Sequence, residues 1–301
     1  MWKGTLTSTV LDADTTHRSI GNDFRTPRSR ILKKSLYAQL QPRLSAATID
    51  LHRTHLGPKG GRAIAALLRQ TTSLTCLRLS WNSLGDEGCR AVADALAPNG
   101  DNVNRQCASV TCLDLTHNGL GAKGAHALAH ALAAGSSLRS LDLYGNALGA
   151  EGAEIIAMAL SANSTLTHLD LSWNALGAHG AAAIGVALKT TTALVSLHLR
   201  RNDIAEEGAE ALARALRSNE TLARLDLQGN ELGEDGAIAF ARALRVNMSL
   251  TSLNLFCTEI DAFRRKLLVD VVSVNAILSS LRLHGNEIPV EIKNEIKKHL
   301  L

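Results

Sequence analysis

Leucines recur along this chain at a fixed spacing, and the stretch LDLSWNALGAHGAAAIGVAL (residues 169–188) shows the pattern of one unit. Leu169 and Leu171 alternate with polar residues, which places both on one side of a short β-strand. Small and apolar residues after Asn174 then fall on one helical stripe: Ala181, Ile184, Gly185 and Leu188. Each unit therefore predicts a strand, a turn and a helix, and small residues on the stripe are expected to let the helix lie close to the strand layer.

The unit repeats every 28 residues, with one longer step of 36 residues. The units open at Ala46, Leu74, Val110, Leu138, Leu166, Leu194, Leu222, Leu250 and Leu278. The long step contains an insertion within APNGDNVNRQCAS, a second candidate for recognition. A fixed period in this range indicates a solenoid, in which each unit buries its apolar face against its neighbours.

A polar residue marks the turn after each predicted strand. It is an asparagine in seven units: Asn82, Asn118, Asn146, Asn174, Asn202, Asn230 and Asn286. Thr54 and Thr258 take its place in the other two units. Such short side chains can bond backbone groups that have left the ladder. Gly177 and Gly180 follow in the quoted unit, and we expect both to permit a tight turn into the helix.

The full consensus, L-x-x-L-x-L-x-x-N-x-L-G-x-x-G-A and then a helix ending in A-L, resembles the ribonuclease-inhibitor-like class of leucine-rich repeats. The resemblance covers residues 46–288 in nine units. It implies an α/β leucine-rich-repeat solenoid, a horseshoe with a parallel β-sheet on the concave face and α-helices on the convex face. Its members include inhibitors, NOD-like receptor sensor domains, Ran GTPase-activating proteins, tropomodulin-like actin regulators and axonemal scaffold subunits. The resemblance therefore implies the fold and leaves the partner open.

Both ends depart from the consensus. Residues 1–26 lack periodicity and predict a basic, flexible arm, whereas an amphipathic pattern predicts an N-terminal capping helix over 27–45. At the other end, the pattern predicts a C-terminal capping helix over 289–301, with Pro289 near its start. Eight Lys and Arg residues against three Asp residues make 1–43 basic, and the rest of the chain is near neutral.

Composition narrows the class of protein. Leucine and alanine dominate the apolar residues, and only 3% of the chain is aromatic, which suits thin stacked layers. The chain has no apolar run of about 18 residues, so we expect no membrane span, and we find no pattern of a secretory signal. Five cysteines without a C-x-x-C motif suit a reduced compartment. We therefore expect a cytoplasmic monomer.

Outward side chains of consecutive strands should be neighbours, because strands in a sheet lie about 4.8 Å apart. The candidate partner-binding residues are Trp173, Arg200, Arg201, Tyr144, Asp170, His198, Trp81, Arg78, His117 and Phe256. Aromatic residues and arginines are typical of binding hot spots. Two alternatives remain: the aspartates of the LDL motif are solvated decoration, and the Trp173 ring lies over the neighbouring turn.

Motifs for catalysis, cofactors or metals are weak. The recurring L-G-x-x-G belongs to the repeat and is no nucleotide loop. The pair His126 and His130 has metal-ligand spacing, but it lacks a glutamate and falls on the outer helix face. We expect three cysteines to lie near one edge of the sheet: Cys76, Cys107 and Cys112. They form either a zinc or redox site or three reduced thiols. We predict no enzyme activity, no cofactor and no metal.

These patterns favour a non-catalytic scaffold or sensor that binds a partner protein on its concave face. One alternative is a Ran-type GTPase-activating regulator, although that family usually carries an acidic C-terminal tail and this chain ends in KKHLL. Another is a cytoskeletal or axonemal scaffold subunit. The basic segment RTPRSRILKK also predicts that the arm binds nucleic acid or an acidic surface.

Overall fold

The computed structural model describes residues 45–97, 109–258, 271, 273–286 and 288–300. Within them, nine parallel strands form one open sheet in sequence order and alternate with eight helices. The strands are β1 (Thr48–Asp50), β2 (Cys76–Arg78), β3 (Cys112–Asp114), β4 (Ser140–Asp142), β5 (His168–Asp170), β6 (Ser196–His198), β7 (Arg224–Asp226), β8 (Ser252–Asn254) and β9 (Ser280–Arg282). The helices are α2 (Gly57–Leu68), α3 (Gly85–Leu96), α4 (Ala122–Ala133), α5 (Gly149–Ala162), α6 (Gly177–Leu188), α7 (Glu206–Leu216), α8 (Gly233–Leu244) and α10 (Val290–His299).

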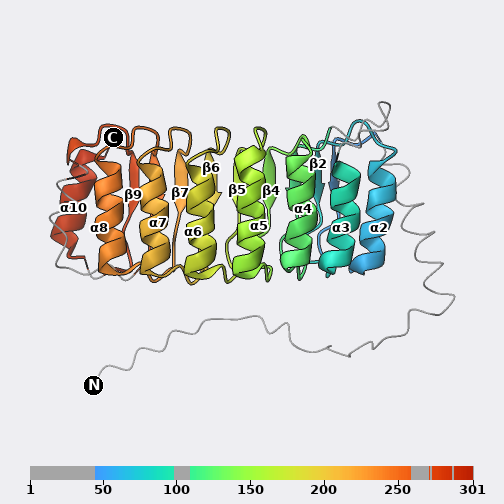
Figure 1. Ribbon diagram of the computed structural model, residues 1–301, viewed down its shortest axis with the longest axis horizontal. Coiled ribbons are helices and arrows are strands. Elements are labelled where there is room, and N and C mark those ends of the chain that lie inside the picture. The colour runs from blue at the N-terminus through green and yellow to red at the C-terminus, as the bar shows by residue number, and fades with distance from the viewer. Residues whose placement is uncertain (1–44, 98–108, 259–270, 272, 287, 301) are drawn as a thin grey trace, which may run out of the picture.

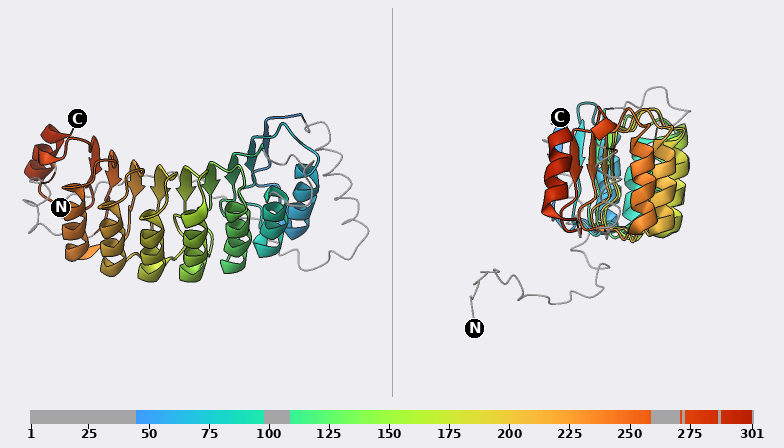
Figure 2. Two further views of the ribbon diagram at one scale, coloured as in Figure 1. Left: turned by 45° about the horizontal axis from the view of Figure 1, so that its top comes forward. Right: turned by 90° about the vertical axis from the view of Figure 1, so that its left-hand side faces the viewer.

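The sheet and the helices form the two sides of a curved solenoid. The strands line the concave side and α2–α8 line the convex side (Figures 1 and 2). Every strand pairs in register with the next, so that Leu141, Leu169 and Leu197, for example, stand side by side. The α/β leucine-rich-repeat solenoid predicted from the sequence is therefore confirmed.

The core is a continuous layer of leucine and alanine between sheet and helices. Leu169 and Leu171 are both buried, and so are Leu166 and Leu176 on either side of them. Three-residue strands bury too little apolar surface to be stable alone, so each unit depends on the units beside it.

The turn asparagines form a hydrogen-bonded ladder through the solenoid. Asn174 donates its Nδ2 to the carbonyl oxygens of Leu171 in its own unit and Leu143 in the unit before, at 3.0 and 2.9 Å. Its backbone N–H donates to Asn202 Oδ1 of the next unit at 2.8 Å. Thr258 continues the ladder, because its hydroxyl donates to the Leu255 carbonyl. The expected turn chemistry is thus present, and it also links neighbouring units.

The glycines of the repeat have two different roles. Gly177 has a φ of +63°, which an L-residue with a side chain rarely adopts, and it turns the chain into α6 as expected. Gly180 lies within α6, and a Cβ there would come within 2.9 Å of the Ala153 Cβ on α5. Gly208 on α7 meets Ala181 on α6 at the same distance. The expectation that small residues mainly bring helix and strand together was therefore incomplete, because they also set the spacing between neighbouring helices.

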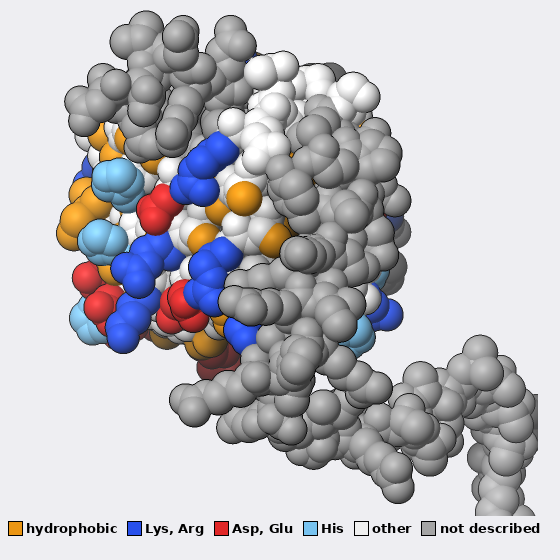
Figure 3. Space-filling model, turned by 90° about the vertical axis from the view of Figure 1, so that its right-hand side faces the viewer, with side chains coloured by type: hydrophobic (Ala, Val, Ile, Leu, Met, Phe, Trp, Pro, Cys, Tyr) orange, Lys and Arg blue, Asp and Glu red, His pale blue; other side chains and the backbone are white. Residues whose placement is uncertain are grey.

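Several predicted segments lie outside the described residues: the arm over 1–26, nearly all of the capping segment 27–45, and the insertion with Cys107. At the other end, α10 follows Pro289 at the C-terminal end of the sheet (Figure 2). Seen from the α2 end, the described surface carries Lys and Arg side chains beside Asp and Glu side chains, with apolar side chains between them (Figure 3). Across the described helices, none has the length and apolar character that crossing a bilayer requires.

Candidate partner-binding surface

The concave side chains stand in rows that run across the strands. We call the last strand position the strand row: Asp50, Arg78, Asp114, Asp142, Asp170, His198, Asp226, Asn254 and Arg282. We call the position three residues later the turn row: Arg53, Trp81, His117, Gly145, Trp173, Arg201, Gly229, Cys257 and Gly285. Tyr144, Arg200 and Phe256 stand between the two rows. All ten predicted residues thus lie in or between these rows, although not all of them make contact with one another.

The turn row has an unusual backbone conformation. Every one of its residues has a positive φ, between +47° at Arg201 and +76° at Gly285. Glycine adopts this region freely, whereas a residue with a Cβ loses roughly 1–2 kcal/mol there. Trp81 and Trp173 nevertheless occupy it, at φ of +60° and +57°. The repeat pattern did not predict this constraint, although glycine at three of the nine positions was a signal for it.

Bulky side chains of the turn row, together with Tyr144 beside it, stack along the rim of the concave face. We call this stack the aromatic ladder: Arg53, Trp81, His117, Tyr144, Trp173 and Arg201. The ring centroids of Trp81 and His117 lie 4.0 Å apart, and Tyr144 then meets His117 at 5.3 Å and Trp173 at 6.5 Å.

A guanidinium group lies over the last ring at each end of the ladder. Arg53 Cζ is 4.9 Å from the centroid of Trp81, and Arg201 Cζ is 5.0 Å from that of Trp173. Both distances permit cation–π attraction. Trp173 therefore contacts Tyr144 and Arg201 in the neighbouring units and still remains 45% exposed.

The aspartates of the strand row have a structural task. Oδ1 of Asp142 accepts the backbone N–H of Tyr144, and Oδ1 of Asp170 accepts that of Ser172, at 2.9 and 2.8 Å. Asp50, Asp114 and Asp226 make the same bond two residues ahead. The alternative of mere solvated decoration is thus wrong, because these side chains bind the backbone where the strand ends. Burial raises the pKa of Asp142, and the negative charges of Asp170 and Asp114 act in the same direction.

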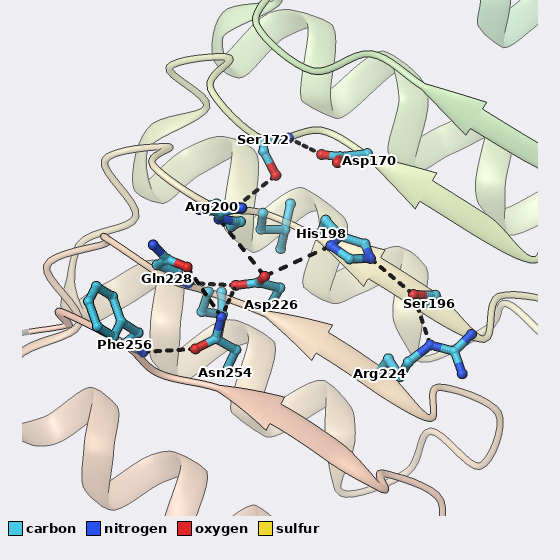
Figure 4. A network of polar contacts seen from close by, with 12 residues as sticks. Asp170, Ser172, Ser196, His198, Arg200, Arg224, Asp226, Gln228, Asn254 and Phe256 are labelled. Carbon is cyan, nitrogen blue, oxygen red and sulfur yellow. Dashed lines mark hydrogen bonds and ion pairs between the residues drawn. The ribbon is translucent and has the colours of Figure 1, made fainter. Parts of the chain in front are cut away.

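A polar network with several cations covers β5–β7 (Figure 4). Nδ1 of His198 and Nε of Arg200 each lie 3.9 Å from Oδ2 of Asp226. Arg224 reaches back over β6, where its Nη2 lies 3.0 Å from His168 Nε2 and its Nε lies 3.4 Å from Ser196 Oγ. Burial lowers the pKa of His168, and the positive charges of Arg224 and His198 lower it further.

Within this network, Ser196, His198 and Asp226 are ordered like a catalytic serine, histidine and aspartate. Ser196 Oγ lies 3.2 Å from His198 Nε2. The serine is only 1% exposed, however, so a substrate carbonyl has no access to its oxygen. The 3.9 Å between His198 and Asp226 also exceeds a hydrogen bond. The arrangement therefore positions the side chains of His198 and Arg200, and it lacks the geometry that acyl transfer requires.

Arg78 and Phe256 stand apart from the central group. Arg78 pairs with Asp50 at 3.6 Å on the first two strands. Phe256 is exposed beyond β8, where its backbone N–H donates to Asn254 Oδ1. These two predicted residues flank the surface formed by the other eight.

The candidate metal residues do not form a site in the described part of the chain. Cys76 and Cys112 are register partners on β2 and β3, and both are free thiols. Burial raises the pKa of Cys112 to about 11, with the neighbouring Cys76 adding to the effect, which disfavours the thiolate that metals bind. His126 and His130 are exposed on α4. The described residues hold no cluster of three or more ligands suited to a metal ion.

Comparison with known proteins places the repeats in a family. The model described as Leucine Rich repeat matches residues 70–93, 106–129, 136–157, 162–185, 192–213, 218–241 and 246–262, together just over half of the chain. The comparison with curated proteins found no match.

Among solved structures, one similar chain is "Leiomodin-1 Actin-Binding Site 2 (ABS2)". It is 28% identical over 41% of this chain and 71% of its own, with a TM-score of 0.37. At that TM-score the two shapes differ too much to compare functions. The repeat match alone indicates a protein-interaction scaffold, and the chain belongs to the leucine-rich repeat family.

Proposed function

We propose that this protein is a non-catalytic scaffold or sensor that binds a partner protein on its concave face, with repeats of the ribonuclease-inhibitor-like class. The observation that carries the proposal is the aromatic ladder. Apart from Tyr144, its members project bulky side chains from a row in which glycine would cost less. Residues held in sparsely populated backbone conformations often lie at functional surfaces.

The ladder suits binding for a second reason. Stacking holds Trp81 and Trp173 in place while leaving 43% and 45% of each residue exposed. Side chains that are ordered before binding lose less conformational entropy when a partner arrives. Trp173 and Arg201 lie at the junction of the ladder and the cationic network, so we assign the centre of the binding surface to them.

The remaining assignments extend this proposal to the ends of the chain. We propose that residues 27–45 and 289–301 cap the solenoid and that the basic arm over 1–26 contributes attraction to an acidic surface or nucleic acid. We expect the protein to act as a monomer. A Ran-type regulator would bind its GTPase on the same concave face, and faster GTP hydrolysis on addition of the protein would favour that reading over plain binding.

A pull-down from cell lysate tests the concave surface. The wild type is compared with the double variant Trp173→Ala, Arg201→Ala and with Met158→Ala, Arg214→Ala, a control on the exposed convex side of α5 and α7. We expect specific partners to be lost only with the concave variant, because truncating a central hot spot costs about 2 kcal/mol or more. Identical partner sets from all three proteins, with thermal unfolding unchanged, would reject this surface.

A further inference from the structure

The concave face separates charge along its length. The strand row carries three adjacent aspartates on β3–β5, which are Asp114, Asp142 and Asp170. Over β5–β7 the outward positions carry three arginines, Arg200, Arg201 and Arg224, together with two histidines, His168 and His198. Asp170 and Asp226 are the only acidic residues at the outward positions of these three described strands. We call this region the cationic patch.

The carboxylate nearest to His198 and Arg200 already has hydrogen-bond donors. Oδ1 of Asp226 accepts the backbone N–H of Gln228 and the Nδ2 of Asn254, both at 3.0 Å. Oδ2 lies 3.9 Å from both His198 and Arg200, beyond hydrogen-bond distance for either. This mostly buried carboxylate therefore neutralises the charge of Arg200 only in part.

The two arginines at the centre of the patch have unused donors. Arg200 Nε is buried and has no hydrogen-bond partner in the described structure. Arg224 contacts His168 and Ser196, and no described carboxylate lies within ion-pair distance of it. A buried donor without a partner is costly, and a guanidinium group binds a carboxylate through two parallel hydrogen bonds.

From these contacts we propose that the cationic patch binds an acidic segment of a partner protein, with one carboxylate on Arg200 and another on Arg224. The inference rests on the proposed function and adds the chemistry of the partner. Trp173 and Arg201 stand beside the patch and supply the apolar contact at its edge.

Charge favours a short acidic segment over a nucleic acid. A long polyanion laid along the concave face would run from the cationic patch onto Asp170, Asp142 and Asp114. Burial raises the pKa of Asp142, and the negative charges of Asp170 and Asp114 beside it act in the same direction. A segment whose acidic residues end at β5 avoids that repulsion, and like charges placed together across an interface suppress the wrong partner.

Fluorescence anisotropy with a labelled peptide tests the proposal. The probe is a 12-residue peptide of alternating Glu and Ser. The comparison probes are a matched peptide of alternating Lys and Ser and a single-stranded RNA. Three forms of the full chain are compared. They are the wild type, the concave double variant Arg200→Gln, Arg224→Gln and the convex double variant Arg214→Gln, Arg242→Gln. The last variant removes the same charge from exposed positions on the convex helices α7 and α8.

We expect the acidic peptide to bind the wild type and the convex control equally and the concave variant at least about tenfold more weakly. Equal binding to all three proteins overturns the proposal, because it attributes the attraction to overall charge or to the basic arm. Tighter binding of the Lys peptide, or RNA binding that alone depends on Arg200 and Arg224, overturns it as well. If the acidic peptide fails while partner capture still depends on Trp173 and Arg201, the inference falls and the proposed function stands.

Discussion

Single residues on the concave face owe their properties to side chains from other units. His168 illustrates this, because burial lowers its pKa and the positive charge of Arg224, two units further along the chain, lowers it further. Trp173 depends in the same way on Tyr144 before it and Arg201 after it. The chemistry of each residue is therefore set by its row rather than by its neighbours in sequence.

The pKa of His168 provides a test at this scale. Arg224→Gln removes one of the two positive charges beside the imidazole, so we expect this pKa to rise towards its ordinary value. NMR titration of the ring resonances measures the shift. Arg214→Gln on α7 is the matched control and should leave His168 unchanged.

The same shift predicts a direction for stability. A lowered pKa means that the unfolded chain takes up a proton on this histidine more readily than the folded protein. The contribution of His168 to folding stability therefore falls as pH decreases through the ordinary histidine pKa of about 6.5. The free energy of unfolding, measured by chemical denaturation between about pH 5 and pH 8, should depend less on pH in Arg224→Gln than in the wild type. A larger dependence in the variant would contradict the assigned cause.

At the scale of elements, the successive helices from α4 to α8 touch through one glycine and one alanine at each interface. Gly208 at the start of α7 lies on Ala181 of α6, and Gly236 lies in the same way on Ala209 of α7. In the G-A pair of the consensus, the glycine thus contacts the helix before it and the alanine contacts the helix after it. Larger side chains at these positions would separate the helices and disturb the registered strands beneath them.

Gly208→Ala tests this packing, because the packing and the helix propensity predict opposite changes in the free energy of unfolding. In a free helix the change would stabilise by about 1 kcal/mol. Here the new Cβ would approach Ala181 Cβ and Ile204 Cγ2 to 2.9 Å, so we expect a loss of about 1–3 kcal/mol in the free energy of unfolding. Urea unfolding measures it. Val186→Ala, at an exposed position of α6, is the control without a clash, and a stabilised Gly208→Ala would refute the contact.

At the scale of the whole molecule, stability is shared between neighbours. The strands are three residues long, and the core and the asparagine ladder both run from unit to unit. A solenoid of this kind behaves as a chain of nearest-neighbour interfaces. A defect in one unit is therefore expected to weaken the two units beside it.

Leu171→Ala creates such a defect in the middle of the sheet. Leu171 is fully buried, and its loss should cost about 2–5 kcal/mol. Hydrogen exchange should show weakened protection on β4 and β6 as well as on β5, with β1 and β9 less affected. Met158→Ala, at a position 72% exposed on α5, is the control and should change neither quantity. Protection lost on β5 alone would argue against coupling between units.

The concave surface could be predicted only in outline. The 28-residue period identified which residues share a row, so Tyr144, Trp173 and Arg201 were expected near one another. It carried no information about the sign of φ in the turn row or about the Asp side chains that bond the backbone. Both depend on how each strand ends against the next unit, and three-residue strands carry too few residues for a pattern to reveal that.

The sequence by itself determined the repeat, the inward leucines and the turn asparagines, because these follow from a period and from alternating burial within each unit. The tertiary structure alone decided how side chains of different units meet: the stacking of Trp81 on His117, the reach of Arg224 over Ser196 to His168, and the contact of Gly208 with Ala181. The physical reason is distance along the chain. Burial is a property of one residue and its immediate pattern, whereas these contacts join residues 27 to 56 positions apart and exist only after the units have stacked.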